Sequence, residues 1–293
     1  MSRLEVLKTY KIYIGGKFPR TESGRYYEAK GAKNKLLANI CLSSRKDFRN
    51  AVVAARSAQG GWSERTAFNR SQILYRIAEM LEARSAQFIQ EIKDQGASEK
   101  MAQKEVEQSI DRLVYYAGWC DKYVQVASSV NPVSSSHFNF STLEPTGVVS
   151  VIVPEESSLL GLVSIVAPII AGGNTVVALA STSKPLCAIS FAEVLNSSDV
   201  PGGVVNILTG EKAELTSHMA SHMDVNAVVY CGSDISLFSE IQEGAVDNVK
   251  RTFMYDRDWF KTEAQGLEFI TDLQEVKTTW HPIENIGGAS STY

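Results

Sequence analysis

The sequence has few cysteines and few histidines, and their spacing fits no metal centre. Four of each occur in 293 residues, and there is no CxxC pair, which argues against a zinc site or a redox pair. Each cysteine lies in an apolar segment, as is typical of small buried side chains in a reducing cytoplasm. His218 and His222 are spaced to share one helix face, but no acidic pattern accompanies them. We therefore predict no metal, and a solvated helix end at these histidines.

The chain also lacks an excess of basic residues and a long hydrophobic run. Its net charge of −4 and pI near 5.7 argue against binding to nucleic acid, which needs a basic surface. The longest apolar run, Leu159 to Ala171, is shorter than the ~20 residues of a membrane span and contains Pro168. The N-terminus has no apolar core of the kind found in signal peptides. These features predict a cytoplasmic protein with no nucleic-acid or membrane partner.

Neither common phosphate-binding fingerprint occurs, because the sequence has no GxGxxG and no P-loop. The second half nevertheless alternates apolar runs with helical stretches. The runs are continuous rather than alternating, which indicates strands of a parallel sheet buried on both faces. They are Val148–Val153, Thr175–Ala180, Val204–Leu208, Ala227–Cys231 and Val249–Tyr255. We predict an α/β fold with a Rossmann-like five-stranded parallel sheet and helices on both faces.

The first half of the chain predicts a short β start followed by helices. Tyr10 to Phe18 alternates apolar and polar residues around a glycine pair, which indicates a hairpin. A capping box at Ser44 to Asp47 begins a helix that we expect to stop at Gly60-Gly61. A second helix ends near Gly96, and a third follows it. The Ser- and Asn-rich stretch 131–141 fits either a linker or an exposed hairpin that packs on another subunit.

Ligands of open parallel sheets bind beyond the carboxyl ends of the strands, so the residues there are the candidates for a site. Glu155 and Glu156 follow the first strand and precede a helix, where the helix dipole stabilises acids. We therefore expect Glu155 and Glu156 to be solvated acids at a helix N-terminus rather than a catalytic pair. Gly232 and Ser233 follow the fourth strand, and their N–H groups are candidates to meet a phosphate, although many such turns are only helix caps.

Three blocks in order resemble the cofactor-binding domain of aldehyde dehydrogenases: EPTGVV at 144–149, AGGNTVV at 171–177 and VPGGVVNI at 200–207. YIGGKF at 13–18 is similar to the N-terminal segment of that family, and the tail 266–278 is similar to its oligomerisation strand. The likeness is greatest to the degenerate second module of members that carry two modules in tandem. It implies that Gly232-Ser233 is the turn that meets the pyrophosphate of NAD.

The same resemblance marks positions where the family's functional residues are replaced. Glu156 stands where the family has the Asn that helps to bind the oxyanion. Leu179 and Thr182 stand in place of the Lys and Glu that hold the adenosine ribose. Lys212 replaces a glycine near the adenine, and Tyr255 replaces the general-base Glu.

One large block of the family has no counterpart, namely the catalytic domain with its nucleophilic cysteine. It is expected after the fifth strand, and none of the four cysteines lies beyond position 231. The resemblance thus divides the chain into an NAD-binding-type α/β domain, 1–126 with 144–258, and an oligomerisation hairpin and tail, 127–143 with 266–281. Neither of these two expected units corresponds to the family's catalytic domain.

Two functions follow from these losses. The first is a non-catalytic oligomerisation or regulatory subunit, a pseudoenzyme that assembles with itself or with an intact aldehyde dehydrogenase. Loss of an oxyanion donor costs roughly 100- to 1000-fold in rate, and loss of a covalent nucleophile on the order of a millionfold. We therefore expect no catalytic residue and no cofactor, with at most weak NAD(P) binding. The alternative is an NAD(P)-linked oxidoreductase or nucleotide sensor that uses the remaining cleft.

Overall fold

The computed structural model describes residues 8–31 and 34–283, so positions 1–7, 32 and 33 of the predicted first unit lie outside the described residues. A parallel sheet of five strands forms the centre, as predicted. Its strands, in the order β10-β9-β6-β7-β8, are Arg251–Met254, Ala227–Tyr230, Val148–Ile152, Thr175–Leu179 and Val205–Leu208. Every residue of β6, β7, β8 and β9 is buried, because helices cover both faces.

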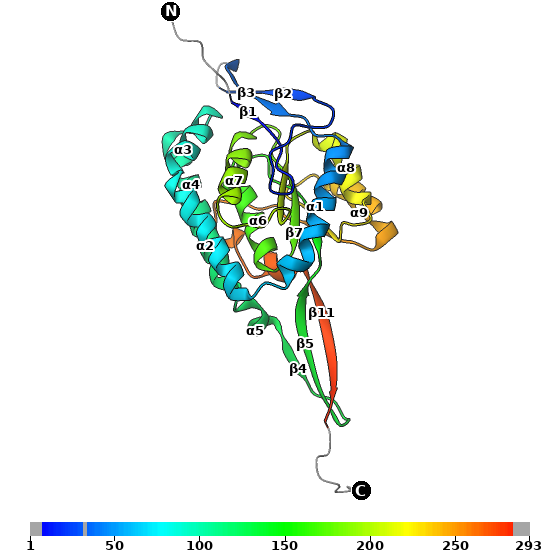
Figure 1. Cartoon of the computed structure of the whole chain (residues 1–293). Helices are drawn as coiled ribbons and strands as arrows, with labels where there is room; N and C mark the ends of the chain where they lie inside the picture. The colour runs from blue at the N-terminus through cyan, green and yellow to red at the C-terminus, as the bar shows by residue number, and fades with distance from the viewer. Residues whose placement is uncertain (1–7, 32–33, 284–293) are drawn as a thin grey trace, which may run out of the picture.

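Alternate side chains of the strands pack into two separate cores. On one face, Val148 and Ile152 of β6 meet α1 (Arg45–Ser63), α8 (Lys212–Ser221) and α9 (Ile235–Ala245). On the other, Val149 and Val151 meet α6 (Leu160–Ala171) and α7 (Leu186–Asn196). A further layer covers α6 and α7 and consists of α2 (Ala67–Ala83), α3 (Ser85–Asp94) and α4 (Glu99–Trp119). Figure 1 shows these layers. Among the described residues, no helix is long and apolar enough to cross a membrane.

The predicted helices exist, but two of their boundaries were wrong. The capping box is present, since the Asp47 carboxylate accepts the Ser44 N–H at 2.8 Å. Helix α1 runs through Gly60 and Gly61 instead of stopping there, because Trp62 is buried and its indole N–H donates to the Ile170 carbonyl at 3.0 Å. The predicted second helix is broken at Arg84 into α2 and α3.

A small sheet near the N-terminus was not predicted. It contains β1 (Thr9–Tyr10), β2 (Tyr26–Lys30) and β3 (Leu36–Cys41) in the order β1-β3-β2. The predicted hairpin at 10–18 is reduced to a tight turn closed by one antiparallel bridge between Ile14 and Lys17. The hairpin does not extend because the Tyr13 N–H donates instead to the Ile207 carbonyl of β8, at 2.8 Å.

A third sheet projects from the body (Figure 1). It contains β4 (Ser129–Asn131), β5 (His137–Pro145) and β11 (Gln274–Pro282), and β5 lies in the middle. The stretch 131–141 is therefore a hairpin and not a linker, and β11 pairs with β5 over its full length. The short helix α5 (Tyr123–Ala127) leads into the sheet. Because β5 runs directly into β6, this sheet is attached at the amino ends of the central strands.

The last central strand, β10, is shorter and more exposed than the predicted buried strand 249–255. All four of its residues are partly exposed, whereas β8 at the opposite edge of the sheet is fully buried. The chain then packs back over α4 through η3 (Thr262–Ala264) and α10 (Glu268–Thr271). Buried Arg112 holds this segment by donating to the carbonyls of Ala264, at 2.5 Å, and Trp259, at 3.3 Å. The short 3-10 helix η2 (Val246–Asn248) precedes β10.

Candidate functional site

The strand order creates one place where a ligand crevice is expected. Helices α6 and α7, which follow β6 and β7, cover one face, whereas α8 and α9, which follow β8 and β9, cover the other. The direction of winding therefore reverses between β6 and β9, and ligands of such sheets bind at this switch point. The residues beyond the carboxyl ends of β6 and β9 include Glu155, Glu156, Gly232 and Ser233.

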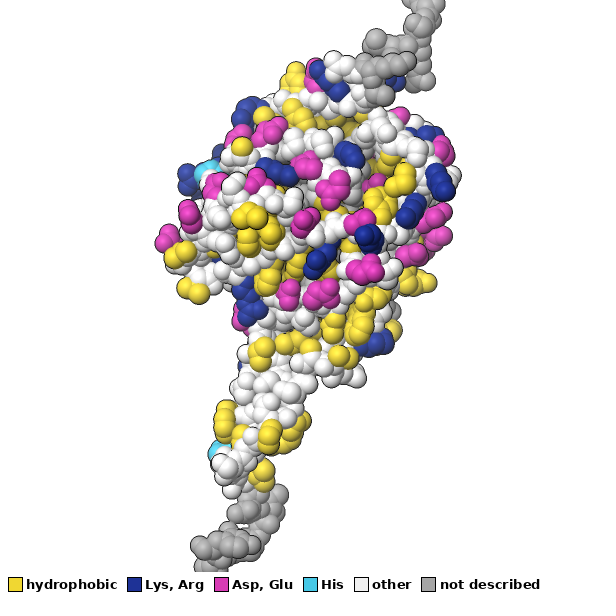
Figure 2. All heavy atoms as spheres, turned by 180° about the vertical axis from the view of Figure 1, so that it is seen from behind, with side chains coloured by type: hydrophobic (Ala, Val, Ile, Leu, Met, Phe, Trp, Pro, Cys, Tyr) yellow, Lys and Arg dark blue, Asp and Glu magenta, His cyan; other side chains and the backbone are white. Residues whose placement is uncertain are grey.

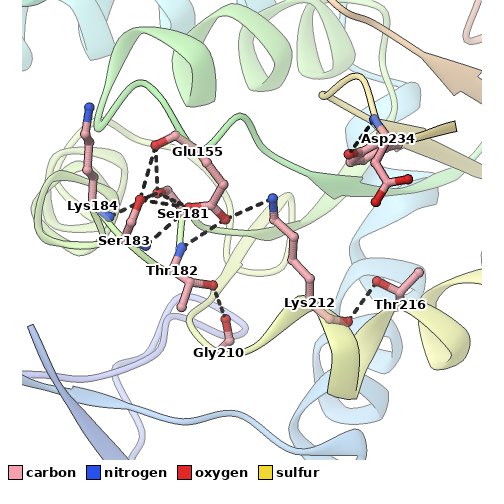
Figure 3. A network of polar contacts seen from close by, with 10 residues as sticks. Glu155, Ser181, Thr182, Ser183, Lys184, Gly210, Lys212, Thr216 and Asp234 are labelled. Atoms are coloured by element: carbon pink, nitrogen blue, oxygen red, sulfur yellow. Dashed lines mark hydrogen bonds and ion pairs between the residues drawn. The ribbon is translucent and has the colours of Figure 1, made fainter. Parts of the chain in front are cut away.

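Glu155 is the centre of a polar network at these strand ends (Figure 3). Its carboxylate accepts the hydroxyl groups of Ser181, at 2.7 Å, and Ser183, at 3.0 Å. The N–H of Thr182 donates to it at 3.3 Å, and the Lys212 ammonium lies 3.0 Å away. Burial alone would raise the pKa of Glu155, but the hydrogen bonds from Ser181 and Lys212 and the charge of Lys212 hold it below its usual value. The prediction of a solvated acid was wrong for Glu155.

Neither glutamate lies at the N-terminus of the next helix. Glu156 is exposed, and α6 begins later, at Leu160. The first N–H groups of α6 are taken by Glu105 of α4, which accepts from Leu159 at 2.8 Å and from Leu160 at 3.2 Å. Glu105 is 5% exposed, and its carboxylate also accepts the Ser157 hydroxyl at 2.8 Å. Glu105 is not among the site residues predicted from the sequence.

The Gly232-Ser233 turn connects β9 to α9, as predicted. A Cβ atom on Gly232 would lie 2.5 Å from the Tyr230 hydroxyl, so the packing of Tyr230 is sufficient reason for a glycine here. The N-terminus of α9 is capped by Asp234, whose carboxylate accepts the N–H groups of Ser236, at 2.9 Å, and Leu237, at 3.2 Å. These donors are therefore already satisfied by an anion.

The remaining positions marked by the resemblance are structural. Leu179 is 1% exposed and packs in the core between β7 and the α1 layer. The Thr182 hydroxyl donates to the Gly210 carbonyl at 2.8 Å, which ties two strand-end loops together. Tyr255 is buried, and its hydroxyl donates to the Asp272 carboxylate at 2.8 Å. Burial, followed by the charge of Asp272, raises the pKa of Tyr255, so it remains protonated.

The cysteines and histidines lie outside this network. All four cysteines are buried and free, and burial raises the pKa of the Cys120 thiol to about 12. Within the ranges 8–31 and 34–283, no group of three or more His, Cys, Asp or Glu side chains is arranged to hold a metal ion. His218 and His222 line one hollow between α1 and α8.

Comparison with known proteins agrees with the strand order and the motifs. The sequence profile of the Aldehyde dehydrogenase family matches residues 19–254. The chain belongs to the aldehyde dehydrogenase family. Cytosolic 10-formyltetrahydrofolate dehydrogenase of Pongo abelii is 32% identical over 251 residues, which are 83% of this chain and 28% of that protein. Putative aldehyde dehydrogenase DhaS of Bacillus subtilis (strain 168) is 30% identical, over 83% of this chain and 49% of that protein.

Solved structures of aldehyde dehydrogenases have the same fold. The NAD+ complex of the enzyme from Bacillus cereus is 26% identical, with a TM-score of 0.80 over 84% of this chain and 50% of that chain. PnpE in complex with nicotinamide adenine dinucleotide is 27% identical, with a TM-score of 0.80 over the same shares. This aldehyde dehydrogenase-family chain thus spans about half the length of the structures that it matches.

The side chains at the switch point do not fit the pyrophosphate of a dinucleotide. Lys212 is a cation in the network, but it is paired with Glu155. The N-terminal donors of α9 and α6 bond to Asp234 and Glu105, and Asp234 directly follows the Gly232-Ser233 turn, whose N–H groups are the predicted phosphate donors. Unit charges of like sign ~4 Å apart repel by about 1–4 kcal/mol, depending on their exposure to water. The carboxylates at the switch point therefore disfavour an anionic ligand there.

Proposed function

We propose that this chain is a non-catalytic assembly or regulatory subunit of the aldehyde dehydrogenase family. The observation that carries the proposal is the set of carboxylates Glu155, Asp234 and Glu105 at the strand ends of the dinucleotide fold. They accept nearby hydroxyl and helix N-terminal N–H donors and place negative charge where an anionic cofactor would bind. Tyr255, at the position of the family's general base, is a buried hydrogen-bonded side chain, which supports the same conclusion.

The projecting sheet supports the assembly role. Directly opposed residues of antiparallel strands share a face, so Leu143, Val276 and Trp280 lie on one face. Val276 is 66% and Trp280 57% exposed. Figure 2 shows hydrophobic side chains along this arm and few charged ones. Exposed apolar side chains gathered on a projecting sheet are typical of a surface that another subunit covers.

The other face of the same sheet is also apolar. Val130 is paired with Phe140, and Phe138 is on the same side of β5. These three residues line a hollow of about 480 Å³. We propose that the units 127–143 and 266–281 join this chain to a second copy of itself or to an intact aldehyde dehydrogenase, with β11 adding to a sheet of the partner.

The assembly role is tested by light scattering after size-exclusion chromatography, alone and with an intact family member from the same organism. We expect a dimer or larger assembly, and we expect the double variant Val276→Glu, Trp280→Glu to lose it. The matched control is Phe68→Glu, Tyr75→Glu, which places two glutamates at exposed aromatic positions of α2. A native chain that stays monomeric in both experiments would contradict the proposal.

The proposed absence of aldehyde oxidation and of dinucleotide binding is tested separately. Purified chain is incubated with NAD+ or NADP+ and a panel of aliphatic and aromatic aldehydes, and reduced cofactor is followed by absorbance. We expect no turnover, and calorimetry should show no dinucleotide binding tighter than the millimolar range. Turnover of any aldehyde, or micromolar affinity for NAD+, would refute the non-catalytic role and leave the assembly result unaffected.

A further inference from the structure

A hollow on the α1 and α8 layer gathers basic side chains that no function assigned above uses. It is lined by Arg45 and Arg49 of α1 and by His218 and His222 at the end of α8, and it encloses about 320 Å³. Lys212 begins α8 at the other end of the helix. At ~1.5 Å per residue, the length of α8 separates the hollow from the Glu155 network by about 15 Å.

The two arginines of this hollow are not paired with acids in the part of the chain that the structure describes. Within the described residues, neither Arg45 nor Arg49 forms an ion pair, whereas their neighbour Lys46 is paired with Glu22 at 2.9 Å. The buried Asp47 carboxylate is directed away, toward the N–H groups of Glu22 and Ser44. The arginines are four positions apart on a helix, so their side chains lie on the same face.

His222 contributes a hydrogen-bond donor. Its Nδ1 accepts the Asp224 N–H at 3.2 Å, so the neutral ring carries its proton on Nε2. Burial lowers the pKa of His222, and the charges of Lys250, Arg49 and Arg45 lower it further, against the opposing effect of Asp224. The Lys250 ammonium donates to the His222 carbonyl at 2.8 Å. Repulsion among these cations would be relieved by a bound anion.

We propose that this hollow binds the phosphate group of a small phosphomonoester. Guanidinium groups match phosphate oxygens in geometry and bind them through paired charge-assisted hydrogen bonds. Met223 is 65% exposed and, with Phe48, supplies an apolar wall for an organic substituent. The enclosed volume suits a small molecule, and the net charge of −4 does not favour a nucleic acid.

The test is calorimetric titration of the full chain with inorganic phosphate and with phenyl phosphate, at pH 7.5 and constant ionic strength. We expect saturable binding of a single equivalent. The double variant Arg45→Ala, Arg49→Ala should weaken it at least about tenfold, since each lost charge-assisted hydrogen bond has an effect of this order. The control Lys100→Ala, Arg257→Ala removes the same charge from exposed positions elsewhere and should bind as the native chain does.

A second pair of variants does not depend on the arginines. Met223→Glu places a negative charge at the mouth of the hollow and should weaken binding several-fold, whereas Met223→Gln should not. Tighter binding of phenyl phosphate than of inorganic phosphate would identify an organic phosphomonoester as the ligand, and equal binding would identify free phosphate. Absence of saturable binding, or equal weakening by the arginine and control variants, would overturn the proposal.

Discussion

The buried carboxylate of Glu105 is a sensitive position of the fold because of the hydrogen bonds that it accepts. Its carboxylate accepts three donors at the start of α6: the Ser157 hydroxyl and the N–H groups of Leu159 and Leu160. Leu159 and Leu160 are each 0% exposed, so water does not replace the lost acceptor without a change in packing. The Glu105→Ala change therefore removes a charged acceptor and leaves buried donors unsatisfied.

The magnitude follows from these contacts. A hydrogen bond to a charged group contributes about 1.5–3 kcal/mol, and an unsatisfied buried donor costs about 1–3 kcal/mol. Because these effects overlap, we expect Glu105→Ala to lower the free energy of unfolding by about 3–5 kcal/mol. Glu105→Gln keeps an oxygen acceptor and loses the charge at the helix N-terminus, so its expected cost is about 1–2 kcal/mol. The whole free energy of unfolding of a typical domain is only about 5–15 kcal/mol.

The assay is urea unfolding followed by circular dichroism, with Glu107→Ala as the control. Glu107 is exposed on the same helix, so its removal should change stability by less than about 0.5 kcal/mol. An effect of Glu105→Ala as small as that of the control would refute the reasoning. Equal losses of stability in Glu105→Ala and Glu105→Gln would show that the retained oxygen acceptor does not stabilise this helix end.

Three further changes test other parts of the structure. Val249 is 90% exposed and has a left-handed backbone with φ of 53°, which glycine adopts more easily than valine, so Val249→Gly should stabilise the chain by about 0.5–1 kcal/mol in the same assay. A lower free energy of unfolding for this variant would contradict the prediction. Burial lowers the pKa of Lys250 from 10.5 to about 8, so native stability should rise with pH between these values, and Lys250→Met should abolish the rise. Tyr255→Phe removes the hydrogen bond to Asp272 and should cost about 1–3 kcal/mol. The folded state holds the Tyr255 proton more tightly than the unfolded state, so the native chain loses stability above the ordinary tyrosine pKa of 10.0, and Tyr255→Phe should reduce this loss. An unchanged dependence of stability on pH above 10.0 would contradict the prediction.

The central sheet was predictable because its signal is local. The continuous apolar run Thr175–Leu179 is buried on both faces, as such runs in parallel sheets are, and helices between the strands allow parallel pairing. Helix ends were less predictable. Gly60 and Gly61 are helical here because the burial of Trp62 outweighs their low helix propensity.

The candidate site was only partly predictable. Glu155 was selected from its place after a strand, but its partners come from two other strand-end loops, and its network is not visible in the local sequence. Glu105 lies 54 residues before Leu159, the residue that it caps. One clue was present, because Glu105 interrupts the apolar stripe of α4 that contains Ala102, Val106 and Leu113.

By itself the sequence determined the class of fold and the family, and it predicted the positions at which functional residues are replaced, because periodicity and motif order depend on neighbours along the chain. Only the tertiary structure decided what the replacements do. It brought Glu155 to Lys212 and Glu105 to the start of α6, and it left Arg45 and Arg49 unpaired among the described residues. Electrostatic interactions depend on distance in space, and the fold sets these distances between segments that are far apart in sequence.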